Sequence, residues 1–258
     1  MQRIFIKVTI FFIIFLAYSA HSMVGQNSSF KFPRKITYKI IRNNKFAASS
    51  ELTFTGKGHS QYVLKMGNIQ GFGISSKEKI VAIMLKKDLS LFSSFVTKGK
   101  EIQEELRFKE EKNLGLLGNQ VYIHKSFKNN TSPTITEIGS PFNVIDLLSS
   151  FVVLSNKIYN QNYNNEKYNL FIDTSYIVDC SVKKNVLRQY IDKQVSTSQV
   201  TLKYSFSKGQ KKNQPESVDL FVFYIYHDKI KGICFPICVE IDDVKGNKCQ
   251  MIAAEVIP

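Results

Sequence analysis

The segment Val200–Phe206 (VTLKYSF) has an apolar or aromatic side chain at every second position. This alternation is typical of a β-strand with one face in the core and the other in solvent. A second segment, Leu220–Tyr226 (LFVFYIY), is apolar throughout. We expect this second strand to be buried on both faces or to line an apolar cavity. The two segments together predict a β-sheet that encloses a large apolar interior.

Short segments rich in β-branched and aromatic residues recur along most of the chain, separated by polar or glycine-containing stretches. This rhythm is typical of an antiparallel meander. The further predicted strands are Ile36–Arg42, Glu51–Thr55, Gln61–Met66, Lys79–Leu85, Glu105–Lys109, Gln120–His124, Asn169–Asp173, Tyr176–Cys180, Phe235–Ile241 and Cys249–Val256, with a hairpin turn at Asp242–Asn247.

One segment has helical periodicity. Between Pro141 and Ile158, apolar residues recur at intervals of three and four, which places Val144, Leu147, Leu148, Phe151 and Val152 along one side of a helix. We predict a helix over about residues 143–156, with Asn143 as its N-cap and Asp146 in its first turn. A second, weaker helical spacing covers Lys183–Lys193.

The chain has 258 residues, of which 43% are hydrophobic, and it shows neither an internal repeat nor a long linker. β-Rich domains of this size are often single. We therefore predict one mainly β domain over residues 35–258, preceded by an extended segment at residues 23–34. Its expected architecture is a single antiparallel meander, strongly curved or barrel-like, with one covering helix.

The first 22 residues predict a secretory signal peptide. Arg3 and Lys7 precede or flank an apolar run at Val8–Ala17, and small residues follow up to Ser22, after which we expect cleavage. The run is about half of the ~20 residues that a membrane-spanning helix needs, so a retained anchor is the less favoured alternative. We expect export to the periplasm of a Gram-negative bacterium, or secretion to the extracellular medium.

The formal net charge is +14, from 35 Lys and Arg against 21 Asp and Glu. Only five of the basic residues are Arg, whereas phosphate and base recognition favours Arg. Export also keeps the protein away from nucleic acid, which we exclude as a partner. An anionic surface or an envelope protein stays open as a partner.

The sequence lacks both the G-x-S-x-G motif of hydrolases and the H-E-x-x-H motif of metalloproteases. A Ser–His–Asp arrangement assembled by the fold, for example around His227 and Asp228, is the least favoured alternative. We predict no catalytic residue and no cofactor.

Four cysteines, Cys180, Cys234, Cys238 and Cys249, lie in the second half of the chain. We predict no metal site, because Cys234 and Cys238 would stand about 13 Å apart on one face of a strand. In an oxidising compartment, one or two disulfides among the four are expected. Buried free thiols are the alternative, and the sequence does not choose between them.

The order of these features resembles the exported bacterial family of domain of unknown function 3108, over residues 35–257. The matching residues are Tyr38, Gly99-Lys100, Glu105-Leu106-Arg107-Phe108, Asp146-Leu147-Leu148-Ser149, Asp179-Cys180-Ser181-Val182 and Phe235-Pro236-Ile237. Leu147 and Ser155 depart from the family's pattern, which tends to have proline and a basic residue there. The resemblance implies an envelope protein of a Gram-negative bacterium and transfers no catalytic residue.

The hypothesis that best fits these features is a module that binds a lipid or other apolar small molecule on the concave face of a curved sheet. The alternative is an envelope interaction or structural protein that acts through a sheet edge or the basic surface. The residues expected to contact the ligand are Phe151, Tyr204, Phe206, Phe221, Phe223 and Ile225.

Overall fold

The computed structural model describes residues 30–67, 78–109, 120–127, 132–172, 175–205, 217–242 and 248–258. Within them, fifteen strands form one sheet in the order β8-β7-β6-β5-β4-β3-β2-β1-β15-β14-β13-β12-β11-β10-β9. Neighbouring strands are antiparallel, except that β9 and β10 are parallel. The chain runs outwards from β1 to β8, crosses to the opposite edge at β9, and returns to β15 beside β1.

The described elements are β1 (Lys35–Arg42), β2 (Lys45–Lys57), β3 (Gln61–Gly67), β4 (Glu78–Leu85), β5 (Leu91–Lys98), β6 (Glu101–Phe108), β7 (Gln120–Ser126), β8 (Thr134–Ser140), β9 (Asn143–Asp146), α2 (Leu147–Tyr159), β10 (Glu166–Phe171), β11 (Ser175–Tyr190), β12 (Lys193–Ser205), β13 (Ser217–Asp228), β14 (Ile233–Asp242) and β15 (Lys248–Ile257). Twelve of the fifteen strands overlap a predicted strand, and β5, β8 and β9 are additional. The residues of the predicted turn between β14 and β15 lie mostly outside the described residues, although Asp242 pairs with Lys248 as a hairpin requires.

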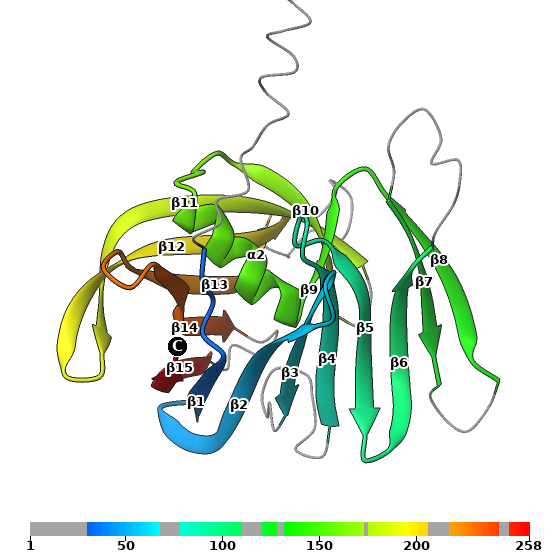
Figure 1. Ribbon diagram of the computed structural model, residues 1–258, viewed down its shortest axis with the longest axis horizontal. Coiled ribbons are helices and arrows are strands. Elements are labelled where there is room, and N and C mark those ends of the chain that lie inside the picture. Colours follow the sequence, from blue (N-terminus) through cyan, green and yellow to red (C-terminus); the bar gives the residue numbers. More distant parts are fainter. Residues whose placement is uncertain are drawn as a thin grey trace, which may run out of the picture.

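The sheet must curl, because its two edge strands are consecutive in the chain. β8 ends at Ser140 and β9 begins at Asn143, so their connection spans at most about 11 Å. In a flat sheet of this order, strands spaced by ~4.8 Å would hold these edges roughly 67 Å apart. The sheet is therefore rolled into a nearly closed, barrel-like wall (Figure 1), and the predicted curved meander is confirmed.

α2 lies inside this wall rather than over one opening of it (Figure 1). The wall closes where β5 contacts β9. The twelve strands from β5 round to β9 surround the helix, and β6, β7 and β8 extend beyond this contact. About eight strands give an interior that side chains alone can fill. A wall of twelve strands is wider, and the helix takes up the remaining space.

The helix begins four residues later than predicted. Asn143–Asp146 forms β9 beside Tyr168–Phe171 of β10, so backbone pairing at the sheet edge overrides the helical spacing of Val144. The N-cap is accordingly Asp146 and not Asn143. The weaker helix prediction at Lys183–Lys193 is wrong, because this segment forms the paired tip of the β11–β12 hairpin.

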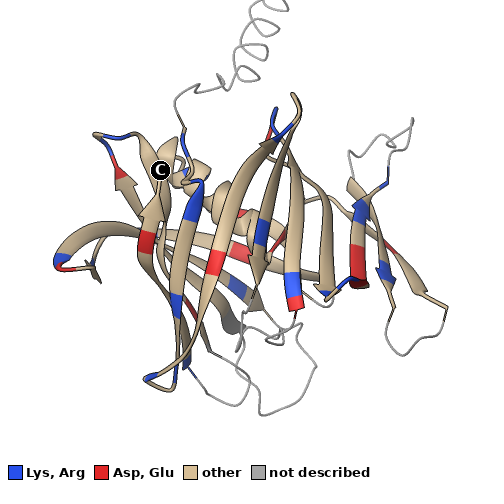
Figure 2. Cartoon of the chain, turned by 60° about the horizontal axis from the view of Figure 1, so that its bottom comes forward, with Lys and Arg blue, Asp and Glu red and all other residues tan. Residues whose placement is uncertain are grey.

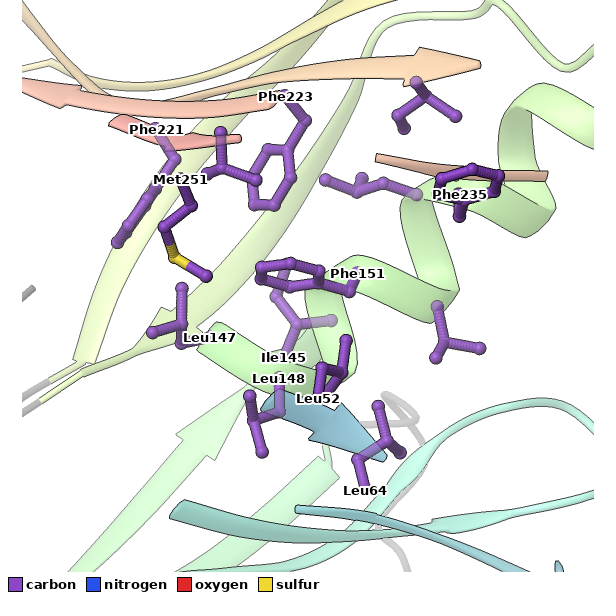
Figure 3. Packing of buried hydrophobic residues seen from close by; sticks show 14 of the residues in the cluster. Leu52, Leu64, Ile145, Leu147, Leu148, Phe151, Phe221, Phe223, Phe235 and Met251 are labelled. Atoms are coloured by element: carbon purple, nitrogen blue, oxygen red, sulfur yellow. The ribbon is translucent and has the colours of Figure 1, made fainter. Parts of the chain in front are cut away.

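The inner face of the wall and α2 share one apolar core. Phe151 of α2 is fully buried, and its ring lies edge-on to Tyr38 of β1 and Phe223 of β13, with centroids 5.8 and 5.5 Å away. Figure 3 shows Phe151 in the middle of this core, with Phe221 and Met251 on one side of the helix. The side chains around the helix thus come from strands far apart in the sequence.

β13 is buried on both faces, as its uniformly apolar sequence predicts. Phe221 and Phe223 face α2, and the tip of the β11–β12 hairpin lies over the outer face, where Tyr190 contacts Tyr226. There the Arg188 guanidinium lies 3.6 Å from the centroid of the Tyr224 ring and 3.0 Å from the Glu240 carboxylate. A second, smaller layer of side chains therefore covers β13 and β14 from outside.

The described part of the predicted extended segment, residues 30–34, joins β14 to the end of α2. The carbonyl of Lys31 accepts the Cys234 N–H at 3.2 Å, and the Phe30 ring lies 5.5 Å from that of Tyr159. The predicted signal peptide at residues 1–22 lies outside the described residues. Within the part of the chain that is described, no helix has the length and apolar character needed to cross a bilayer.

We expect Phe151→Ala to lower the free energy of unfolding by about 3–5 kcal/mol, because it removes a fully buried ring and leaves a cavity between the helix and the wall. Val153→Ala, at a half-buried position of the same helix, should cost less than about 1.5 kcal/mol. Urea denaturation followed by circular dichroism measures both values. Equal losses for the two variants would show that α2 does not lie inside the wall.

Candidate functional site

The residues predicted to contact a ligand lie on the inner face of the wall or on α2. Phe151, Phe221, Phe223 and Ile225 are each at most 2% exposed and fill the core around the helix. Tyr204 is half-buried on the same face of β12, and its ring contacts that of Tyr176 with centroids 5.5 Å apart. Phe206 lies outside the described residues.

Asp146 caps the N-terminus of α2 and fastens it to the wall. One carboxylate oxygen accepts the Ser149 N–H at 2.7 Å, while the Ser149 hydroxyl accepts the Asp146 N–H at 2.8 Å, which makes a capping box. The other oxygen accepts the hydroxyl of Ser94 on β5 at 2.5 Å. Burial raises the pKa of Asp146 above its ordinary value, although the hydrogen bonds from Ser94 and Ser149 oppose this shift.

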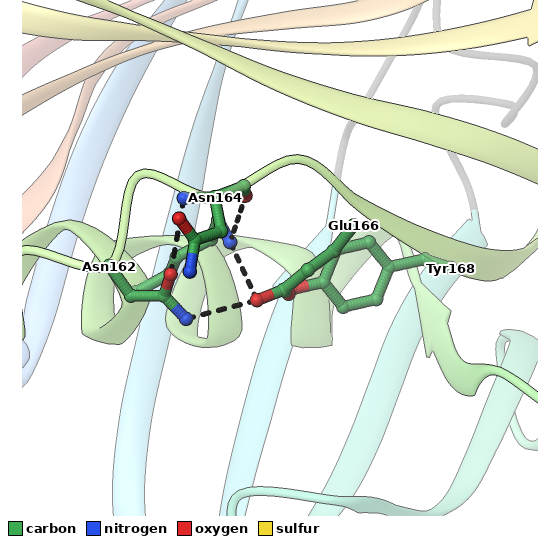
Figure 4. Close-up of polar contacts among 5 residues, drawn as sticks. Asn162, Asn164, Glu166 and Tyr168 are labelled. Atoms are coloured by element: carbon green, nitrogen blue, oxygen red, sulfur yellow. Dashed lines mark hydrogen bonds and ion pairs between the residues drawn. The ribbon is translucent and has the colours of Figure 1, made fainter.

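The C-terminal end of α2 is fastened by a second polar group (Figure 4). The buried ammonium of Lys157 lies 2.8 Å from both the Glu166 carboxylate and the carbonyl of Asn164. The Asn162 amide and the Tyr168 hydroxyl also donate to Glu166, at 2.9 and 2.7 Å. Burial alone would raise the pKa of Glu166, but the bonds from Lys157 and Tyr168 outweigh it, and the pKa is lowered.

The boundary between β9 and the strands opposite it, β5 and β7, is here called the seam, and side chains close it. β9 pairs with β10 along one edge only. On its other edge, the Val144 N–H donates to the Gln120 side-chain oxygen at 3.2 Å, and the Asp146 N–H donates to the Ser149 hydroxyl. The backbone donors that a neighbouring strand would use are therefore already satisfied. The wall has no hydrogen-bonded ladder at this one boundary of the described sheet.

A pocket of about 160 Å³ lies at one end of the seam. It is formed by the turn between β4 and β5, the start of β7, β9 and one residue of α2, and its lining residues are Asp88, Leu89, Ser90, Gln120, Asn143, Val144, Ile145 and Val153. Of the predicted ligand-contact residues that the structure describes, none lines this pocket. It lies beside the filled interior, at the place where the wall closes.

All four cysteines are buried free thiols. A bulge opposite Tyr224 and Ile225 pairs Cys238 with Tyr224 and Cys234 with His227, which places the two thiols on opposite faces of β14 and not on one face as expected. Cys249 pairs with Ile241, three positions from Cys238 along the strand, too far for a disulfide. The free-thiol alternative therefore describes the structure. Among the described residues, no three His, Cys, Asp or Glu gather as metal ligands would.

His227 and Asp228 do not form part of a triad. The His227 ring packs on Tyr159, with centroids 5.0 Å apart, and burial together with the nearby Lys229 lowers its pKa. The Asp228 carboxylate accepts the backbone N–H groups of Ile230 and Lys231, both at 3.1 Å, and so shapes the turn after β13. A triad needs the carboxylate to bond to the imidazole, and here the two side chains have other partners.

No family model matches this chain, and no curated protein or solved structure is significantly similar to it. The resemblance to domain of unknown function 3108 therefore stays a prediction.

Asp146→Asn should change how the stability of the protein depends on pH. Because the pKa of Asp146 is raised on folding, the folded state holds the proton more tightly, and the wild type loses stability as the pH rises from about 4 through the folded-state pKa. Asn keeps an oxygen acceptor for the Ser149 N–H and cannot ionise. The variant should therefore gain stability relative to the wild type between about pH 4 and about pH 7.

Urea denaturation at both pH values measures this difference in the free energy of unfolding. The matched control is Asp192→Asn, in the exposed turn between β11 and β12, which should stay close to the wild type at both pH values. A difference between Asp146→Asn and the wild type that does not change with pH would contradict the role of burial at Asp146.

Proposed function

We propose that this protein binds an apolar ligand, such as a lipid chain, inside the barrel-like wall, and that α2 fills the site when no ligand is bound. The observation that carries the proposal is that an apolar interior, too wide for its own side chains, is filled by a helix. A helix of 13 residues is ~20 Å long and ~10 Å wide. The space it fills exceeds the ~300–1,000 Å³ of common small-molecule pockets.

The middle of α2 is held by apolar contacts. Its two buried serines there, Ser150 and Ser155, donate their hydroxyls to the carbonyls of Leu147 and Phe151 within the helix. These hydroxyls need no partner on the wall. Displacement of the middle of α2 would therefore leave no polar group of the wall without its hydrogen bond. The polar bonds that fasten the helix lie at its two ends.

The seam supplies a route to the interior. Every other boundary in the described sheet is a ladder of backbone hydrogen bonds, whereas β9 is held to the strands opposite by bonds from Gln120 and Ser94. Each such bond contributes about 1 kcal/mol, or somewhat more where a charged group accepts it. Opening the seam thus breaks fewer hydrogen bonds than separating two paired strands. Under this proposal Tyr204, Phe221, Phe223 and Ile225 contact the ligand.

The charges on the outer surface are mixed, which favours a binding site in the interior over one on a basic outer face. Figure 2 shows Lys and Arg interspersed with Asp and Glu along the strands. Pairs such as Lys167 with Asp179, at 2.7 Å, and Lys109 with Glu137, at 3.1 Å, neutralise part of the charge. Exposed pairs of this kind contribute little to stability, but they divide the positive surface into small areas.

We expect a hydrophobic fluorescent probe, N-phenyl-1-naphthylamine, to bind the protein, and its uptake to depend on the seam. Gln120→Cys with Asn143→Cys, joined by a short bismaleimide, ties β7 to β9 across the seam, since the two side chains already meet at 3.4 Å. The native thiols are buried, and burial raises the pKa of Cys180 and Cys238 to about 12, so they should not react. Stopped-flow fluorescence should show uptake slowed at least about tenfold.

The matched control is the same double variant with each new thiol capped by N-ethylmaleimide, which should take up the probe at the rate of the uncapped variant. Equal rates for the cross-linked and capped forms would show that the ligand does not pass through the seam. If no form binds the probe, and mass spectrometry of protein purified without detergent finds no lipid, the proposed function is wrong.

The proposal includes export, because an apolar carrier of this kind serves a compartment with lipid surfaces. The chain made in its own cell should lose residues 1–22 and begin at Met23. Intact-mass spectrometry of the protein recovered from the envelope or the medium measures this directly. A mature chain that keeps the first 22 residues would contradict signal-peptide cleavage.

A further inference from the structure

The pocket at the seam is too small to hold a whole lipid. Its volume of about 160 Å³ is close to that of a cavity, about 150 Å³, that takes up one benzene molecule. Drug-sized pockets begin at about 300 Å³. Because Val153 of α2 lines the pocket, it reaches the helix that fills the interior. The pocket therefore suits one end of a ligand whose remainder lies in the seam or the interior.

Leu89 keeps a strained backbone to line this pocket. Its φ of 58° is left-handed, a conformation that costs free energy for any residue with a side chain and that glycine adopts without cost. The Leu89 N–H donates to the Leu85 carbonyl at 2.9 Å, which closes the turn, and the side chain packs against the core. A glycine would relieve the strain and remove the side chain from the pocket. The side chain thus forms one wall of the pocket as well as part of the core.

Asp88 is the one ionisable residue among the lining residues that the structure describes, and it gives this part of the pocket a negative charge. One of its carboxylate oxygens accepts both the N–H and the hydroxyl of Ser90, at 3.0 and 2.6 Å. The ammonium of the neighbouring Lys86 donates instead to the carbonyl of Gly58 at 3.0 Å, and it lies over the Tyr62 ring. The pocket thus combines a carboxylate and two side-chain amides with four apolar side chains.

We infer that the pocket binds the head of a single-chain amphiphile, and that this head is a cationic ammonium group. The Asp88 carboxylate would accept the charged N–H donors, and the chain would run past Leu89 and Val153 into the seam. This inference rests on the proposed function, which it deepens by naming the head group. A carboxylate head would meet the like charge of Asp88 and is disfavoured.

Titration calorimetry with dodecylammonium, dodecanol and dodecanoate, each below its micelle-forming concentration, tests the inference on the full chain. Dodecylammonium should bind at least about tenfold more tightly than dodecanoate. Asp88→Asn keeps the oxygen that accepts both Ser90 bonds and removes the charge. It should therefore weaken the binding of dodecylammonium at least about fivefold and leave the binding of dodecanol nearly unchanged. Leu89→Gly should weaken the binding of all three ligands.

Asp192→Asn removes a carboxylate from an exposed turn and should leave all three affinities unchanged, and thermal denaturation confirms that each variant folds. Equal binding of dodecylammonium and dodecanoate, or a preference that survives in Asp88→Asn, would overturn the head-group site and leave the interior site intact. Failure of all three ligands to bind the folded wild type would overturn the proposed function itself.

Discussion

The connection between Ser140 and Asn143 determines the shape of the whole molecule. It joins opposite edges of a fifteen-stranded sheet through two residues, so the sheet has to roll up. A rolled sheet of this many strands surrounds a space that must be filled, and the element that fills it comes next in the chain. The connection, the edge strand β9 and α2 follow one another without interruption, so one stretch of sequence both closes the wall and fills it.

Side chains that close the sheet at β9 also satisfy backbone groups that a free sheet edge would leave unpaired. An exposed edge offers unpaired N–H and C=O groups on which other chains can add strands. At β9, Gln120 and Ser149 satisfy the outward N–H groups, and Asp146 receives Ser94 from β5. The edge is thereby protected without being fixed by a ladder. This boundary is therefore closed by side-chain hydrogen bonds where a ladder of backbone bonds closes the others of the described sheet.

Much of the sheet could be predicted from the sequence, because a period of two in Val200–Phe206 and uniform apolarity in Leu220–Tyr226 report directly on burial. The helical spacing of Lys183–Lys193 was misleading, since the same apolar positions serve a strand once β12 pairs with it. β9 has four residues, too few for any period to show.

The seam itself was beyond prediction for a different reason. Ser94 and Gln120 are ordinary polar residues in their local sequence, and they become important only because the fold brings β5 and β7 to β9. The one local signal at the pocket is a leucine where the turn requires a left-handed residue, but this requirement is visible only in the structure. Residues whose roles depend on contacts between distant strands carry no pattern of their own.

Some buried positions of α2 carry serine although the interior around the helix is apolar. If the helix served packing alone, leucine or alanine at positions 150 and 155 would avoid burying hydroxyl groups that have to donate back to helix carbonyls. A helix of leucine, however, would expose one continuous apolar surface on leaving the wall, and such surfaces aggregate. Hydroxyls that are satisfied within the helix are compatible with both the apolar interior and water. The hydroxyls of Ser150 and Ser155 therefore depend on neither the wall nor water for their hydrogen bonds.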